Sequence, residues 1–318
     1  MATKKERVEE IVLFYLDNGE EKTIETYGIN YESLARYKRL FGEYGGDIEN
    51  ITVLRKIKDR YTPDELEAIA SGGRIPKTNF EVPEIDFTGQ HIRFAHITDT
   101  HIGSIYYLPE RMEAIAEEIR KESVEFVVHT GDVTEGMSKR DGHIYECTHL
   151  GYDKQREYAI EQLSMIDAPI YFIDGNHDRW HIKNAGALIV KDIAERLPNA
   201  EFIGHDEGNI TLAGKATLRL FHGEDGNSYA ISYRIQKIIE AFSGGEKPNI
   251  LCVGHTHKCI HMPNERNVIA FSGGCIEKQS QWMRGKRISA HCGFWIIDVW
   301  VGKISGISKH SAIWYPFY

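Results

Sequence analysis

The sequence lacks paired cysteines, long apolar runs and an excess of positive charge. Its 318 residues include 5 cysteines with no CxxC pair among them. This odd, dispersed set argues against a disulfide scaffold or a zinc ribbon, and it favours a reducing compartment. No apolar run reaches the length of about 18 residues that a membrane span needs, and no apolar segment follows the charged N-terminus. We therefore expect a soluble cytoplasmic protein with no signal peptide and no membrane partner.

The charge balance limits the surfaces that the protein can present. A formal net charge of −9 argues against a protein whose whole surface binds nucleic acid. It does not exclude a local basic site, because net charge says nothing about distribution. Hydrophobic residues make up 42% of the chain and charged residues 27%, which is the composition of a globular protein with a sizeable core.

Residues 1–72 have helical patterns. One helix is expected to end at Gly19, a second short helix to end in a glycine turn, and Asn30 to cap a third. A further helix is expected over residues 62–73. The third helix carries three cations, Arg36, Lys38 and Arg39. A short helix, a turn and a basic helix are the outline of a helix-turn-helix, so residues 1–72 are interpreted as a small all-α domain with DNA as a candidate partner.

A change of pattern follows this segment. Residues 73–90 hold prolines and glycines without a helical period, so we place a linker there. Residues 91–318 alternate short apolar runs with helical patterns, which predicts an α/β domain. The last two runs are expected to form a hairpin that turns at Val301-Gly302.

Five apolar runs of the α/β domain end in residues suited to metal binding or acid–base chemistry. These residues are Asp99 and His101, Asp132, Asn176 and His177, His222, and His255 and His257. In open α/β sheets such residues gather at the carboxyl ends of the strands. Oxygen ligands combined with imidazole nitrogens suit Mn, Fe, Zn or Ni better than Ca or Mg. We therefore expect a site for two metal ions, with Asp132 as the bridging carboxylate.

The motifs at these strand ends are TDTHIG, TGDVTEG, DGNHD, FHG and GHTH, in that order. Together they resemble the five signature motifs of the calcineurin-like metallophosphoesterase superfamily, over roughly Ile92 to Val301. The resemblance implies a two-sheet αββα sandwich of the metallophosphoesterase type, here preceded by the small helical domain. It also implies two divalent metal ions, for which we expect Mn²⁺, with Fe, Zn and Ni as the alternatives.

The resemblance implies a role for each motif residue. One metal ion would be held by Asp99, His101, Asp132 and His257. The second would be held by Asp132, Asn176, His222 and His255. His177 would stay free of metal and stabilise or protonate the leaving oxygen, and its neighbour Asp178 would orient such a group. Hydroxide generated between the two ions would attack phosphorus in line, without a covalent enzyme intermediate.

Residues beside the motifs have two interpretations each. Arg179 and Lys258 directly follow two motifs, and either contact the substrate phosphate or are solvated charges. The insert over residues 136–154 is longer than a minimal connection and is expected to form the rim of the site. On this rim His143 and Tyr145 are candidate substrate contacts, although His143 belongs to no motif and is otherwise expected at the surface.

The metal core does not select the substrate. A helix-turn-helix-like leading segment resembles a phage and bacterial group labelled repair-exonuclease-like, which favours a phosphodiesterase acting on nucleic acid or nucleotides. The first alternative is a phosphomonoesterase or cyclic-nucleotide phosphodiesterase with a small substrate. The second is a DNA-binding regulator whose phosphoesterase domain is not catalytic, although such a scaffold would be expected to have lost ligands. The sequence does not indicate an oligomeric state.

Overall fold

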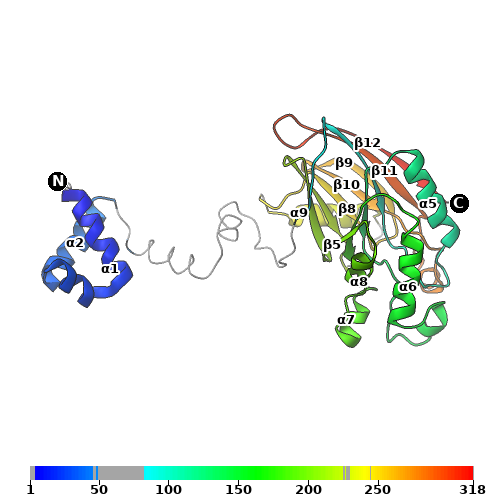
Figure 1. The fold of residues 1–318 in the computed structure, drawn as a ribbon, viewed down its shortest axis with the longest axis horizontal. Helices are drawn as coiled ribbons and strands as arrows, with labels where there is room; N and C mark the ends of the chain where they lie inside the picture. The colour runs from blue at the N-terminus through cyan, green and yellow to red at the C-terminus, as the bar shows by residue number, and fades with distance from the viewer. Residues whose placement is uncertain are drawn as a thin grey trace. The chain divides into compact units, whose positions relative to one another are not determined.

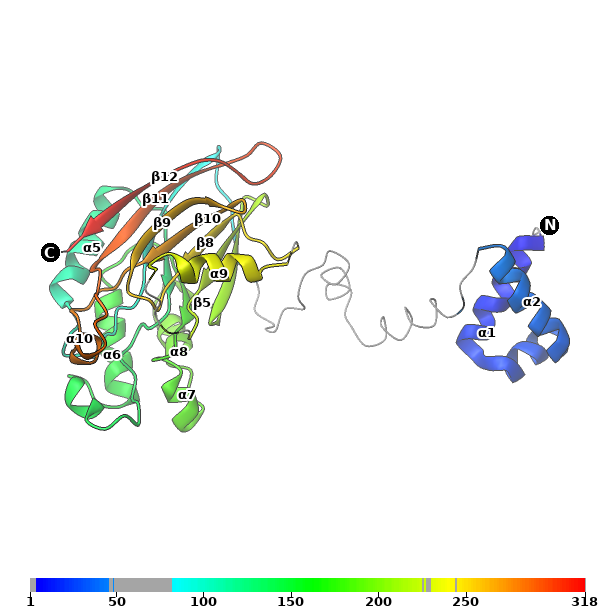
Figure 2. The same ribbon diagram turned by 180° about the vertical axis from the view of Figure 1, so that it is seen from behind.

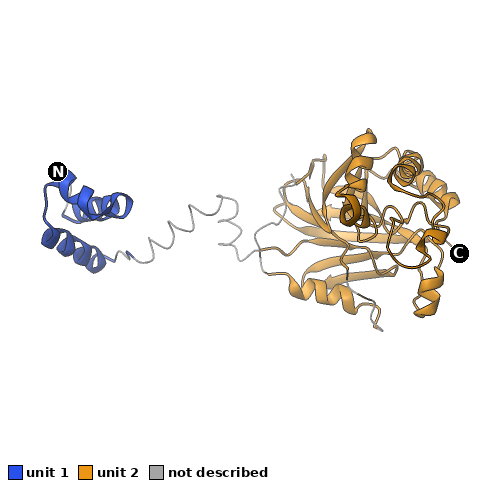
Figure 3. Cartoon of the chain, turned by 90° about the horizontal axis from the view of Figure 1, so that it is seen from below, with its two compact units in different colours: residues 1–76 blue, residues 77–318 orange. Residues whose placement is uncertain are grey.

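The computed structural model describes residues 4–45, 48, 82–224, 226, 230–243 and 245–317. The chain divides into two compact units, Met1–Pro76 and Lys77–Tyr318 (Figure 3). The helix expected over residues 62–73 lies outside the described residues.

The N-terminal unit contains two packed helices, α1 (Lys4–Tyr27) and α2 (Tyr31–Glu43). α1 is interrupted at Gly19, where φ is 81° and ψ is 175°, so the expected break between two helical segments is present. Asn30 caps α2 as expected, because its side chain accepts a hydrogen bond of 2.9 Å from the amide of Ser33. The apolar contact between the helices centres on Val8, Val12 and Phe41.

The second unit is built on two six-stranded sheets. The first sheet has the order β12-β11-β2-β3-β4-β5. Its strands are β2 (His91–Ile97), β3 (Phe126–Thr130), β4 (Ile170–Asp174), β5 (Ala200–His205), β11 (Gly293–Val301) and β12 (Ile307–Pro316). The second sheet has the order β1-β6-β7-β8-β10-β9. Its strands are β1 (Glu84–Ile85), β6 (Glu207–Leu212), β7 (Ala216–Phe221), β8 (Ile250–Val253), β9 (Cys259–Glu265) and β10 (Val268–Gly273).

Helices cover the outer face of each sheet. α5 (Pro109–Lys121), α6 (Tyr152–Leu163) and α8 (Ile189–Arg196) pack their apolar faces on the first sheet (Figure 1). α9 (Tyr233–Ala241) packs Ile235 and Ile239 on β8 and β10 of the second sheet (Figure 2). The remaining helical turns are η1 (His143–Glu146), α7 (Trp180–Ala185) and α10 (Gln281–Gly285).

The inner faces of the two sheets share one apolar core. Phe94 and Phe126 of the first sheet are fully buried there together with Leu218 and Phe271 of the second. Because both faces of each sheet are covered, the central strands read as nearly continuous apolar runs rather than alternating ones. The expected αββα sandwich is therefore the observed architecture.

The strands that carry the motifs run in parallel within each sheet. β2, β3 and β4 are parallel neighbours in one sheet, and β7 and β8 are parallel neighbours in the other. The five predicted strands are thus present, but they belong to two sheets. The predicted hairpin is also present, since β11 and β12 pair antiparallel across residues 302–306.

The predicted linker over residues 73–90 extends too far toward the C-terminus. Within it, β1 pairs in parallel with β6 at the edge of the second sheet. Ile85 and Phe87 pack against the core between the sheets. Their apolar side chains draw this part of the segment onto the sheet despite its prolines. Residues 84–87 therefore belong to the α/β unit.

Within the described part of the chain, no helix combines the length and the apolar character that a membrane span requires.

Candidate metal centre

The strand ends of both sheets bring six of the seven predicted metal ligands into two groups. In each group the three potential ligand atoms all lie within 4.8 Å of one another. The first group consists of Asp99, His101 and His257, and the second consists of Asp132, His222 and His255. The seventh residue, Asn176, places its Oδ1 atom 3.1 Å from Nε2 of His222. Each group contains three residues of one of the two ligand sets expected from the motifs.

The carboxylate of Asp132 reaches both groups. Its Oδ2 atom lies 3.2 Å from Nε2 of His222 and 3.8 Å from Nε2 of His101. Asp132 is almost completely buried, with 2% of its surface exposed. A single carboxylate between two ligand groups is the arrangement that a pair of nearby metal ions requires.

The backbone of the site is held in a sparsely populated conformation. Five of the seven residues have left-handed φ angles, namely Asp99 (48°), His101 (47°), Asp132 (50°), His255 (68°) and His257 (53°). Non-glycine residues seldom adopt this region, and such strain concentrates at functional sites. The tight turns aim the side chains inward directly after each strand.

Two glycines allow the motif loops to approach each other. A Cβ atom on Gly131, whose φ is 92°, would lie 2.6 Å from Nδ1 of His222. A Cβ atom on Gly175 would lie 2.2 Å from Oδ1 of Asp132. Close packing against Asp132 therefore explains the glycine at position 175 directly.

The hydrogen bonds leave electron-rich nitrogens facing the site. His101 donates from Nδ1 to Oε2 of Glu135 at 2.9 Å, and His222 donates from Nδ1 to the carbonyl of Thr130 at 2.6 Å. Each Nε2 atom therefore faces the site and can bind a metal ion once it carries no proton. Nε2 of His257 lies 3.3 Å from Nε2 of His101 and 3.2 Å from Oδ1 of Asp99. This convergence of imidazole nitrogens and carboxylate oxygens fits divalent cations.

Opposing effects set the charge states of these groups. Burial alone would raise the pKa of Asp132, but the imidazoles of His222 and His177 bring it well below its usual value. Burial opposes protonation of His222, yet the negative charge of Asp132 raises the pKa of His222 to about 10. The site thus stabilises positive charge next to Asp132.

His177 lies beside the ligand groups. Its amide donates to Oδ1 of Asp132 at 2.8 Å, and its Nδ1 donates to the backbone carbonyl of Glu135 at 2.9 Å. The ring of Trp180 packs against the ring of His177 at a centroid distance of 4.0 Å. Burial lowers the pKa of His177, but Asp132 and Glu135 outweigh it and raise that pKa above the usual value. A fixed, readily protonated imidazole can donate from Nε2.

Asp178 does not contact the imidazole of the neighbouring histidine in any described hydrogen bond. Its buried carboxylate accepts from the amides of Val133, Thr134 and Gly175 and from the hydroxyl of Thr134, at 2.8–3.0 Å. The side chain therefore ties the loop after β3 to the loop after β4. Its position indicates that it fixes the backbone of both loops.

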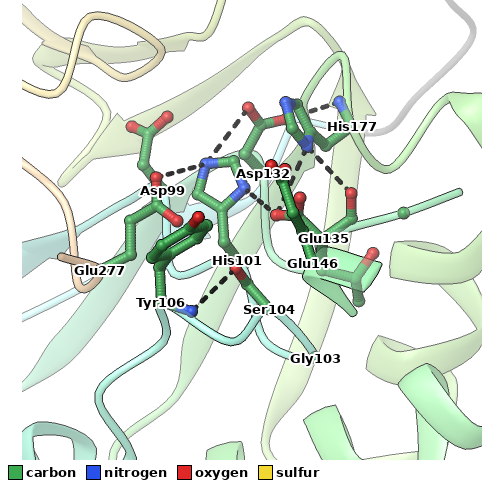
Figure 4. Close-up of polar contacts among 12 residues, drawn as sticks. Asp99, His101, Gly103, Ser104, Tyr106, Asp132, Glu135, Glu146, His177 and Glu277 are labelled. Atoms are coloured by element: carbon green, nitrogen blue, oxygen red, sulfur yellow. Dashed lines mark hydrogen bonds and ion pairs between the residues drawn. The ribbon is translucent and has the colours of Figure 1, made fainter. Parts of the chain in front are cut away.

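Glu135 was not singled out from the sequence, although it lies within the second motif. Its carboxylate contacts Nδ1 of His101 at 2.9 Å on one side (Figure 4). On the other side it contacts Nε2 of His143 at 2.8 Å. His143 is 1% exposed, so the expectation of a surface position is wrong. The buried carboxylate of Glu135 draws the imidazole inward. Rather than contacting solvent, His143 supports the acid that holds His101.

Glu277 was also missed, since it follows the last motif by many residues and no local pattern marks it. Figure 4 shows it on the side of His101 opposite Glu135. Its Oε1 atom lies 3.4 Å from Nδ1 of His257 and 4.0 Å from Nε2 of His101. Burial, together with the charges of nearby acids, raises the pKa of Glu277 well above its usual value. A cation at this position would favour its ionised form.

A cavity of about 370 Å³ opens over the centre. His101, Asp132, Asn176, His177, His255 and His257 line it, whereas Asp99 and His222 are buried at 0% and 2% exposure. Ser138 and Arg140 from the insert over residues 136–154 also line it, as expected for a rim. This volume is at the lower end of the usual range for small-molecule sites.

None of the four residues expected to contact the substrate is among the described residues that line the cavity. The guanidinium of Arg179 pairs with Asp174, Asp206 and Glu224. Lys258 donates from Nζ to the carbonyl and the hydroxyl of Ser289, both at 2.6 Å. Tyr145 is 83% exposed, and neither it nor the buried His143 lines the cavity. These placements favour structural roles for Arg179 and His143.

Comparison with known proteins agrees with this geometry. The family model of the calcineurin-like phosphoesterases matches residues 92–259, slightly more than half of the chain. The chain therefore belongs to the calcineurin-like phosphoesterase family. No curated protein matches it significantly.

Two solved structures are similar at low sequence identity. One is described as a novel archaeal phosphodiesterase; it is 17% identical, the match covers 70% of this chain and 100% of that one, and the TM-score is 0.41. The other is Vps29 of Chaetomium thermophilum, 10% identical over 71% of this chain and 97% of that one, with a TM-score of 0.35.

Proposed function

We propose that the protein is a dinuclear-metal-dependent phosphodiesterase that acts on a nucleotide or nucleic-acid phosphodiester. The observation that carries the proposal is the position of Asp132, whose Oδ2 atom lies within 4 Å of a histidine from each ligand group. A catalytically inactive scaffold would have no need of this buried, strained arrangement. The family supports phosphoester hydrolysis as the reaction class.

The two ligand sets assign seven residues to two divalent ions. Asp99, His101, Asp132 and His257 would hold one ion, and Asp132, Asn176, His222 and His255 would hold the other. We expect Mn²⁺ at both positions, since mixed oxygen and imidazole ligands suit it, with Fe, Zn and Ni as alternatives. Bound divalent ions supply water activation at neutral pH and neutralise the charge of the phosphate oxygens.

The protein's own groups would position the phosphoester and donate a proton to its leaving oxygen. The Nδ1 proton of His177 is committed to the carbonyl of Glu135, so its Nε2 atom faces the cavity as the free nitrogen. Asp132 and Glu135 favour the protonated imidazole. His177 would then donate its Nε2 proton to the leaving oxygen, which stabilises the negative charge that develops there.

The cavity favours a substrate of nucleotide size. Of the described residues that line it, Arg140 is the one lysine or arginine, and it pairs with Glu146. A channel for long nucleic acid would need several cations to contact successive phosphates. Among the two substrate classes in the proposal, these features favour a nucleotide phosphodiester over a polymer.

The helix-turn-helix interpretation of the N-terminal unit stays a prediction. Lys38 pairs with Glu20 at 2.8 Å and lies over the ring of Tyr15, and Arg39 pairs with Glu43. Two of the three cations expected to face DNA thus have partners within the unit. A gel-shift titration of the full chain with duplex DNA tests the prediction, and binding that is insensitive to salt would contradict it.

A substrate panel tests the proposed function. Full-length protein with Mn²⁺ is expected to hydrolyse bis-p-nitrophenyl phosphate and a nucleotide phosphodiester. Parallel assays use p-nitrophenyl phosphate, cyclic nucleotides and labelled single- and double-stranded DNA. Hydrolysis of p-nitrophenyl phosphate alone would instead identify a phosphomonoesterase. No turnover on any substrate, with no metal bound, would favour the non-catalytic regulator.

A further inference from the structure

The cavity has an apolar and aromatic part to its lining as well as the polar metal ligands. This apolar part, the aromatic wall, consists of Trp180, Tyr106, Trp282, Met283 and Ile288. Trp180 packs on His177, so the wall begins directly beside the group proposed to protonate the leaving oxygen. An organic group attached to a phosphate at the metal centre would therefore meet this wall.

The indole ring of Trp282 is accessible to a ring of a bound ligand. It lies on α10, and 49% of its surface is exposed. No ring contact involves it among the described residues, whereas Trp180 packs against both His177 and His143. The hydroxyl of Tyr106 accepts a hydrogen bond of 3.2 Å from the backbone amide of Gln281, which anchors the start of α10 at the cavity. A large exposed indole at the edge of a pocket commonly marks a binding surface.

We propose that Trp282 and the adjoining aromatic wall form a subsite that stacks the nucleobase of the substrate. This inference rests on the proposed function only for the position of the phosphate at the metal centre. Base stacking on aromatic side chains suits any nucleobase, because every base has a π-face. The subsite therefore selects for the presence of a base and tolerates differences in its identity.

The cations around the cavity give no support for a second phosphate as the occupant of this wall. Of the described residues that line the cavity, Arg140 is the one lysine or arginine, and it pairs with Glu146. A neutral ring needs no such cation, so this lining favours it over a further anionic group.

Two hydroxyls give the subsite polar contacts for a base. The hydroxyl oxygen of Ser138 accepts a hydrogen bond from the backbone amide of Arg140, and that of Ser280 accepts one from the backbone amide of Met283, both at 3.2 Å. Each hydroxyl can still donate its proton to a ring nitrogen or carbonyl oxygen. An alkyl chain would leave both donors without a partner, which favours a heteroaromatic ring over a lipid-like group.

Calorimetric titration of the Mn²⁺-loaded full chain with AMP and with ribose 5-phosphate tests the subsite. The two ligands share the phosphoester and differ by the base. We expect AMP to bind wild-type protein about tenfold more tightly. In Trp282→Ala this preference should fall to less than about twofold, with the affinity for ribose 5-phosphate unchanged, whereas Trp282→Phe should keep most of it. Tyr233→Ala, which removes an exposed aromatic ring outside the cavity, should behave as wild type.

The remaining outcomes would reject either the subsite or the proposed function. Equal binding of AMP and ribose 5-phosphate to wild-type protein would overturn the subsite, as would an equal loss for both ligands in Trp282→Ala. Hexyl phosphate binding as tightly as AMP would also overturn it, because the wall would then be a general apolar surface. A preference for AMP that depends on Trp282, in a protein without hydrolytic activity, would retain the subsite and reject the proposed function.

Discussion

The Nδ1 atom of His101 lies 2.9 Å from the Oε2 atom of Glu135. The same carboxylate accepts a hydrogen bond from His143 through its other oxygen. This pairing fixes the ring orientation of a proposed ligand and increases its basicity, as carboxylate partners of metal-bound histidines do. His143 holds the carboxylate in turn. The three residues connect the insert over residues 136–154 to the metal centre.

The first prediction concerns this contact. Glu135→Gln should lower the affinity for Mn²⁺ by about 10- to 100-fold, because His101 loses its oriented anionic partner. Calorimetric titration with Mn²⁺ measures the effect. Glu146→Gln is the matched control, since Glu146 lines the same cavity but pairs with Arg140. An equal loss in both variants would mean that Glu135 contributes only negative charge.

The second prediction concerns His177. His177→Ala should retain both metal ions and lose kcat, because the residue faces the cavity and is not needed in either ligand set. The loss should be about 100-fold or more on a methyl phosphodiester and much smaller on a p-nitrophenyl ester, whose leaving group needs no proton. Steady-state kinetics on the two esters measures the difference. An equal loss on both would contradict proton donation by His177.

The third prediction concerns Asp178. Asp178→Ala leaves three amides and one hydroxyl without an acceptor in the buried loops after β3 and β4. The free energy of unfolding should fall by about 3 kcal/mol. Urea unfolding of the full chain, followed by circular dichroism, checks this value. Unchanged stability would show that water replaces the carboxylate at little cost.

The fourth prediction concerns pH. Asp132 raises the pKa of His222 to about 10 against the effect of burial, whereas burial lowers the pKa of His255 to about 4. Near neutral pH the metal-free protein therefore holds a proton on His222 that a metal ion must displace. Since the metal-free state binds more protons, the affinity for the ion at this position should rise with pH, by about tenfold per unit between roughly pH 6 and pH 9.

Calorimetry in buffers of different ionisation enthalpy measures this proton directly. About one proton should be released for the ion held by His222. Binding without proton release would contradict the assigned charge state of His222.

The sequence predicts the parts of the site in which strand and ligand are contiguous. Asp99, Asp132 and His255 each follow a short apolar run, so the position of the strand end already places the side chain. Their left-handed backbone angles were not predicted, because they depend on turns that the packing of two sheets enforces. The strand-end argument did not assign the five strands to particular sheets, and the structure draws them from both sheets.

Contacts between segments that lie far apart in the chain could not be predicted from the sequence. Arg179 follows the third motif, but in addition to Asp174 at the end of β4 its direction is set by Asp206 and Glu224, which come from the separate loops after β5 and β7. Glu277 approaches His257 only because the chain after β10 returns to the centre, where the amide of Ile276 donates to the carbonyl of Asp99 at 3.1 Å. Neither relationship has a local signature in the sequence.

The most direct test of the dinuclear site combines metal stoichiometry with turnover. Chelator-treated full-length protein is titrated with Mn²⁺ while hydrolysis of bis-p-nitrophenyl phosphate is followed, for wild type and for Asp132→Asn. We predict two Mn²⁺ ions per wild-type chain, with turnover that appears as the second ion binds. Asp132→Asn should lose metal binding and activity together, because both ligand groups lose their shared carboxylate. Full activity with one ion per chain, or an active Asp132→Asn variant, would contradict the shared-carboxylate centre.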